Sequence, residues 1–71
     1  MKHSVLIAGH ATSITLEPEF WDALKEIALA DGKSLNALVE AVDATRTGNL
    51  SSALRLFVLK RLQDHLRPLS N

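Results

Sequence analysis

One strand-like segment followed only by helix-like segments is the feature that most limits how this chain folds. From Thr12 to Glu17 the residues alternate with period two, with Thr12, Ile14 and Leu16 on one parity and Ser13, Thr15 and Glu17 on the other. This pattern predicts a half-buried strand over residues 11–17. A strand of this length is not stable alone, so it needs a partner strand.

Two sources of that partner strand are open. Ser4 to Ile7 is β-prone, and Ala8-Gly9-His10 can turn the chain, so residues 1–10 form either an extra strand or an N-terminal arm. Alternatively, residues 11–17 of two chains pair about a two-fold axis. That pairing buries Ile14 and Leu16 on the helices and turns Ser13 and Thr15 outward.

The rest of the chain predicts three helices. The first covers residues 18–30, because Pro18 suits a first turn and Asp31-Gly32 ends the apolar repeat. The second covers residues 34–45 with Ser34 as its N-cap, and the third covers residues 50–66, capped by Asn49 or Ser51 and ended by Pro68. Trp21 has core spacing on the first helix, and its indole N–H should reach a polar partner.

The third helix is apolar over much of its circumference. One stripe contains Leu50, Ala53, Leu54, Phe57, Val58 and Leu62, and Leu56, Leu59 and Leu66 widen it. Such a helix should be covered on more than one side, in part by a second chain. A chain of 71 residues without cysteine has no disulfide to stabilise it, which also favours an oligomer. The expected dimer core is Ile14, Leu16, Leu54, Phe57 and Val58.

The net charge of zero combines unequal segments. Residues 1–16 hold one base, residues 17–43 hold seven acids and two bases, and residues 44–71 hold five bases and one acid, giving +1, −5 and +4. Either an acidic face meets a basic face of a neighbouring chain, or the charges are solvated surface, which is the commoner outcome.

Catalytic and metal-binding patterns are missing from the sequence. His3, His10 and His65 share no ligand spacing, and the three glycines are isolated. Ser34 and Ser52 lie in no nucleophile turn. We expect no enzyme, no metal and no cofactor. Neither a signal peptide nor a membrane span is predicted, so we expect no membrane association and a cytoplasmic protein.

Three runs resemble a known family. They are Ile14-Thr15-Leu16-Glu17-Pro18-Glu19-Phe20-Trp21-Asp22-Ala23-Leu24, Gly32-Lys33-Ser34-Leu35-Asn36-Ala37-Leu38-Val39 and Asn49-Leu50-Ser51-Ser52-Ala53-Leu54-Arg55. Across residues 12 to about 62 the chain resembles the ribbon-helix-helix domain of MetJ/Arc-type bacterial DNA-binding proteins, in a short stand-alone branch with an added third helix. The resemblance implies a mainly α fold with a short β-ribbon, forming an intertwined two-fold dimer, within one domain over residues 1–71.

The resemblance also implies a function and its residues. The family's dimeric β-ribbon enters the major groove of double-stranded DNA in transcription regulators. By position, Ala11, Ser13 and Thr15 would face the bases, and Lys33 and Ser34 would direct backbone N–H groups at phosphate. Lys2 would lie near phosphate if residues 1–10 form an arm.

An alternative function follows from the width of the ribbon. If residues 5–7 pair with residues 12–16, the dimer sheet has four strands and spans about 14 Å, whereas the major groove is about 12 Å wide. The chain would then be a dimeric protein-interaction module, antitoxin-like or an adaptor, that captures a partner through exposed parts of the third helix such as Leu56 and Leu59.

Overall fold

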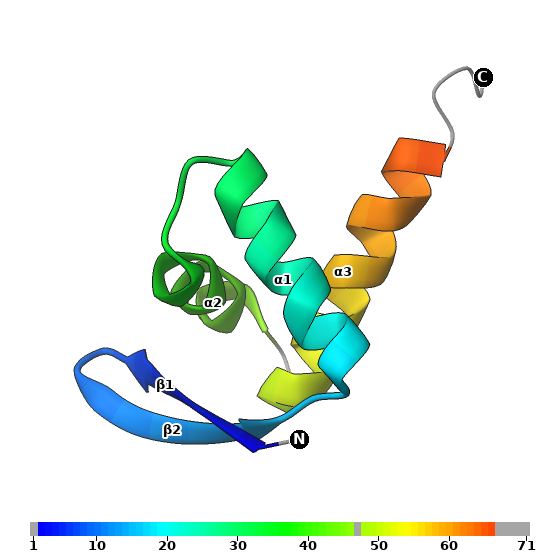
Figure 1. The fold of residues 1–71 in the computed structure, drawn as a ribbon. Coiled ribbons are helices and arrows are strands. Elements are labelled where there is room, and N and C mark those ends of the chain that lie inside the picture. The colour runs from blue at the N-terminus through cyan, green and yellow to red at the C-terminus, as the bar shows by residue number, and fades with distance from the viewer. Residues whose placement is uncertain (1, 47, 67–71) are drawn as a thin grey trace.

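A β-hairpin and three helices make up the chain in a computed structural model, which describes residues 2–46 and 48–66 (Figure 1). The elements are β1 (Lys2–Ile7), β2 (His10–Thr15), α1 (Pro18–Ala30), α2 (Leu35–Thr45) and α3 (Leu50–Leu66). The helices lie together on one side of the hairpin, and α1 contacts α3, which it crosses in this view (Figure 1).

Residues 2–7 form an extra strand and not an arm. β1 pairs antiparallel with β2, from Lys2 opposite Thr15 to Ile7 opposite His10. Ala8 and Gly9 connect them with φ of 53° and 83°, and two consecutive positive φ values are typical of the tight type I′ turn that matches strand twist. β2 therefore has a partner strand from its own chain.

The second strand begins one residue earlier and ends two residues sooner than the sequence predicts. At Thr15, Ser51 Oγ accepts a hydrogen bond from the backbone N–H at 3.3 Å, and Arg55 Nη2 donates to the carbonyl at 3.3 Å. Leu16 then turns into the core, where it is fully buried. The pair Lys2–Thr15 is the last of the ladder, and α3 side chains bind the backbone groups of Thr15 that face away from β1.

Local capping explains where the helices begin and end. α1 ends in a Schellman motif, in which Lys33 N donates to the carbonyl of Ala28 at 2.9 Å and Gly32 has φ of 69°. Ser34 Oγ caps α2 by accepting from Ala37 N at 3.0 Å. Asn49, and not Ser51, caps α3, because its Oδ1 accepts from Ser52 N at 3.1 Å. The predicted stop at Pro68 lies outside the described residues.

A single apolar cluster joins the hairpin to the helices. Its buried members are Val5, Ile14, Leu16, Leu24, Ala28, Leu38, Val39, Val42, Leu50, Leu54 and Val58. Leu54 and Val58 are thus buried by their own chain, and only Phe57 of the predicted dimer core is partly exposed. The dimer role of these residues stays a prediction, but burying them does not require it.

The partly buried Trp21 packs against this core, as predicted. Its ring stacks on His3 of β1, with centroids 3.6 Å apart and planes 3° from parallel. The expected polar partner for the indole N–H does not occur among the described residues. Trp21 instead fixes β1 on α1 through the imidazole ring.

Four leucines of α3 are exposed, so the chain does not bury the whole apolar surface predicted for this helix. The exposed fractions are 56% for Leu56, 47% for Leu59, 50% for Leu62 and 80% for Leu66. One side of α3 faces the core, and these four leucines, the α3 leucine patch, face outward. The wide apolar face of this helix is therefore only half covered within the chain.

The unequal charge segments meet within the chain. Arg55 Nε of α3 lies 2.9 Å from Glu17 Oε1 at the start of α1, and Arg61 Nη2 lies 2.9 Å from Asp31 Oδ2 at its end. The Arg55 hydrogen bond lowers the pKa of Glu17, and the Arg61 hydrogen bond lowers the pKa of Asp31. Both α3 arginines thus bind acids that flank α1, an arrangement that neither sequence interpretation included.

Candidate nucleic-acid interface

The hairpin has one face on the core and one face in solvent. Cross-strand partners share a face, so the outward set contains the pairs Lys2–Thr15, Ser4–Ser13 and Leu6–Ala11, all exposed. We call these six residues the ribbon face. It carries one positive charge, no acid, three hydroxyls and two apolar side chains, and the helices lie on one side of the hairpin only (Figure 1).

The ribbon face contains four of the residues predicted from sequence. Ala11, Ser13 and Thr15 are exposed on β2, and Lys2 is exposed on β1. The sequence did not predict Ser4 and Leu6. The run Ser4 to Ile7 has apolar residues at both alternating positions, so its pattern does not show which side of the strand faces solvent. The two-residue turn sets the register and with it the outward side of β1.

Helix α2 holds the outer edge of β1. Asn36 Oδ1 accepts from the backbone N–H of Leu6 at 2.9 Å, and Asn36 Nδ2 donates to the Leu6 carbonyl at 2.8 Å. Glu40 Oε2 accepts from the N–H of Ala8 at 3.3 Å. The Asn36 amide therefore pairs with Leu6 as a neighbouring strand would, and this contact fixes the tip of the ribbon.

Hydrogen bonds from α3 cover only one end of the outer edge of β2. Thr15 is bonded to Ser51 and Arg55 of α3. The alternating ladder also turns the N–H and C=O of Ala11 and Ser13 away from β1, and no hydrogen bond reaches those groups within residues 2–46 and 48–66. This stretch of edge is open to another strand.

The predicted phosphate site at the start of α2 is only partly available. Lys33 and Ser34 are exposed, and the Asn36 contact places this helix start beside β1. However, the N–H of Lys33 is bonded to Ala28 in the Schellman motif, and the hydroxyl of Ser34 caps its own helix. The charge of Lys33 and the first-turn N–H groups of Leu35 and Asn36 are what α2 offers to an anion.

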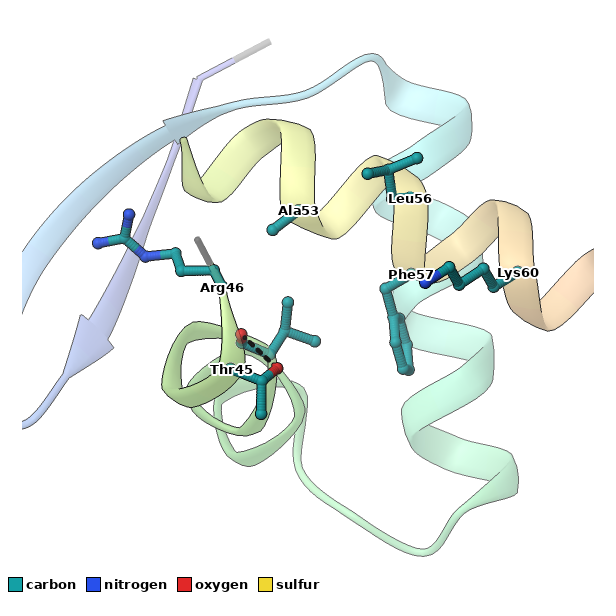
Figure 2. A pocket seen from close by; sticks show the side chains of 7 residues that line it. Thr45, Arg46, Ala53, Leu56, Phe57 and Lys60 are labelled. Carbon is teal, nitrogen blue, oxygen red and sulfur yellow. Dashed lines mark hydrogen bonds between the residues drawn. The ribbon is translucent and has the colours of Figure 1, made fainter. Parts of the chain in front are cut away.

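A hollow of about 270 Å³ lies between the end of α2 and α3 (Figure 2). Its lining residues are Val42, Thr45, Arg46, Ala53, Leu56, Phe57 and Lys60. Phe57 points from α3 into this space, and the Thr45 hydroxyl donates to the Val42 carbonyl at 3.2 Å (Figure 2). The hollow has an apolar floor and no acid–base pair, which suits packing more than chemistry.

Neither a metal cluster nor a spanning helix occurs in the described part of the chain. No three His, Asp or Glu side chains gather within residues 2–46 and 48–66. None of the helices described there has both the length and the apolar character needed to cross a membrane.

Comparison with known proteins identifies the family. The family model described as the ribbon-helix-helix domain matches residues 1–62. The chain belongs to the ribbon-helix-helix domain family. Ribbon-helix-helix domains generally bind DNA in transcription regulators, and the matched residues contain the hairpin, α1, α2 and most of α3.

A solved structure has the same ribbon-helix-helix architecture. The chain is similar to an uncharacterized protein from Bordetella pertussis Tohama I, with 33% identity and a TM-score of 0.74. The match covers 100% of this chain and 63% of the other, so this ribbon-helix-helix chain spans less than two thirds of its neighbour's length. No curated protein matches the chain.

Proposed function

We propose that this ribbon-helix-helix chain is a sequence-specific DNA-binding protein that regulates transcription, and that its ribbon face enters the major groove. The ribbon face itself is the observation that carries the proposal. Its six side chains are exposed, short or flexible, and free of acids, so a polyanion can approach them. Hydroxyls bind several base edges, and apolar groups contact the thymine methyl.

The number of strands decides how such a ribbon would fit. One hairpin has a single gap of about 4.8 Å between strands, well within a groove about 12 Å wide. Pairing along the open edge of β2 would give four strands across about 14 Å. We therefore propose that each chain reads DNA with its own hairpin and that a homodimer sets two hairpins on adjacent half-sites.

Assigned roles follow from this arrangement. Ser4, Ser13 and Thr15 would contact base edges, Lys2 and Lys33 would contact phosphates, and the first turn of α2 would add backbone N–H groups. The proposal involves no catalytic residue and no cofactor, and it places the protein in the cytoplasm with the DNA that it binds.

Selection from random duplexes at low salt tests the proposal. We expect one enriched sequence. Its affinity should fall as the salt concentration rises, because the protein neutralises some phosphates. The fall should be modest, because these phosphates are few. Ser13→Ala should lower affinity about 5- to 100-fold at one position of the site, whereas Lys33→Ala should weaken all sequences alike. If no sequence is enriched, the protein does not read DNA.

The α3 leucine patch and the neighbouring hollow favour a second candidate, a dimeric protein-interaction module, antitoxin-like or an adaptor. Exposed apolar patches often mark contacts with other proteins. In this case Ser13→Ala and Lys33→Ala would leave capture of the partner protein unchanged. Leu56→Glu or Leu59→Glu would abolish that capture. The two sets of variants therefore separate the candidates.

A further inference from the structure

Leu29 of α1 is the most exposed large apolar side chain among the described residues, at 82%. Asp22 and Glu26 lie seven and three positions before it, so the three exposed side chains share one face of the helix. The buried residues of α1, Leu24 and Ala28, lie on the opposite side. We call Asp22, Glu26 and Leu29 the α1 outer face, which combines carboxylates with one large apolar group.

The groove between α2 and α3 has the opposite charge. It consists of the hollow of about 270 Å³ and a second hollow of about 150 Å³, and Phe57 lines both. Each hollow also has a lysine in its lining, Lys60 in the larger and Lys33 in the smaller. Neither lysine forms an ion pair within residues 2–46 and 48–66. The one acid of the lining, Asp31, is bound to Arg61, so the groove offers an apolar floor with unpaired positive charge.

The α1 outer face and this groove lie on different sides of the molecule. Each of the three helices contacts the other two, and neither hollow is lined by a residue of α1 (Figure 2). Since α1 turns Leu24 and Ala28 toward the core, its outer face points away from the groove. One chain therefore cannot place Leu29 in its own groove, whereas two chains can join head to tail.

We propose that the α1 outer face of one chain docks in the α2–α3 groove of the next. Leu29 enters the larger hollow against Phe57. Glu26 lies one turn before Leu29 and reaches Lys60 at the rim; Glu26, like Lys60, has no ion-pair partner in the described part of the chain. Burial of the leucine supplies affinity, and the charge pair sets the orientation.

This contact is distinct from the assembly expected for DNA binding. Its two surfaces differ and lie on different sides of the chain, so each added chain presents a free surface to another and the contact does not close as a pair. A dimer formed through the α3 leucine patch has a fixed mass, whereas head-to-tail contacts add further chains. The proposal does not rest on DNA binding.

Sedimentation of the chain without DNA at rising protein concentration tests the contact. We expect the mean mass to grow past that of a dimer at about 0.01 M salt, where charges act over about 30 Å, and to grow less at about 1 M, where they act over about 3 Å. Leu29→Ala should lower the association constant roughly 10-fold, and Glu26→Lys or Lys60→Glu roughly 3- to 10-fold. All three side chains are exposed, so circular dichroism should show an unchanged fold.

A mixture of the two charge-reversed chains tests the pairing itself. Glu26→Lys and Lys60→Glu each place like charges at the contact, whereas chains that alternate in a mixture meet with opposite charges. The equimolar mixture should therefore regain the growth of the wild type.

Glu19→Lys is the matched control, because it changes the net charge as Glu26→Lys does but lies about 15 Å from Leu29 at a helical rise of about 1.5 Å per residue. Alone, it should grow as the wild type does. Mixed with Lys60→Glu, it should give smaller assemblies than the charge-swapped mixture, because Lys60→Glu chains then accept no α1 outer face.

Four results would overturn the proposal. A wild-type chain that never exceeds the mass of a dimer leaves the groove to the partner protein of the second candidate function. Growth that Leu29→Ala does not reduce would exclude this leucine from the contact, and a charge-swapped mixture no larger than its separate components would exclude the pairing. Growth that disappears in Leu59→Glu with Leu62→Glu, and in no groove variant, would belong to the α3 leucine patch.

Discussion

Asn36 shows how one side chain can set the geometry of the ribbon. Its amide binds both backbone groups of Leu6 across 30 residues of sequence. Asn36→Ala removes two hydrogen bonds whose partners water can reach, so we expect a loss of about 1 to 2 kcal/mol in the free energy of unfolding. Urea unfolding measures this loss, with Gln63→Ala on exposed α3 as control. Equal stability of the two variants would mean that the ribbon holds without Asn36.

Leu54 and Leu56 are a second comparison at the residue scale, since they lie two positions apart on α3. Leu54 is fully buried, and Leu56 is 56% exposed. Leu54→Ala should cost about 2 to 5 kcal/mol through the cavity that it leaves, enough to unfold a domain of this size. Leu56→Ala should cost little in thermal unfolding of the single chain. A large loss at Leu56 would show that assembly contributes to the measured stability.

At the scale of elements, two arginines join α3 to the ends of α1. The pKa of both Glu17 and Asp31 is lowered by these contacts, so the folded state favours the ionised carboxylates. Their stabilisation is complete above the ordinary pKa values of 4.5 and 3.8 and is lost as the pH falls through these values and the lower folded ones. The free energy of unfolding should therefore decrease below about pH 4.5.

The double variant Glu17→Gln, Asp31→Asn tests this acid dependence. It should show a shallower decrease in stability between pH 5 and pH 2 than the wild type, while Glu19→Gln, on exposed α1, should keep the wild-type slope. Chemical unfolding at each pH supplies the values. Parallel curves for wild type and double variant would contradict a role for these pairs.

The elements also show what the sequence could predict. All three helices follow the predicted bounds closely, because Pro18, Gly32, Ser34 and Asn49 act on neighbouring residues. The hairpin was only one of two alternatives, since Ala8-Gly9 is a weak turn signal and Ser4 to Ile7 shows no parity. The Asn36 and Arg55 contacts join residues 30 or more positions apart, and no periodic pattern encodes such pairs. The sequence therefore predicted the β2 residues of the ribbon face and Lys2, and it missed Ser4 and Leu6 of β1.

For the whole molecule, the hairpin changes the argument for a dimer. A lone strand would require a second chain, but β1 supplies the partner here, and the buried residues of α3 are covered within the chain. The α3 leucine patch and the open edge at Ala11 and Ser13 are the surfaces left for a two-fold dimer. Assembly through the α3 leucine patch would leave each hairpin two strands wide, whereas pairing along the open edge of β2 would give a sheet of four strands. We therefore expect the dimer to form through α3.

Substitution within the α3 leucine patch tests that expectation. Leu59→Glu with Leu62→Glu places charges on an exposed surface, so the chain should stay folded while sedimentation shifts from dimer to monomer at micromolar concentration. Since each half-site would then bind alone, affinity for a two-site duplex should fall by more than about 10-fold, as expected when two binding events are no longer linked, while affinity for a single half-site stays unchanged. Glu19→Lys on α1 is the charge control. A variant that stays dimeric would move the interface to the open edge of β2, and a wild-type chain that is a folded monomer would end the dimer prediction.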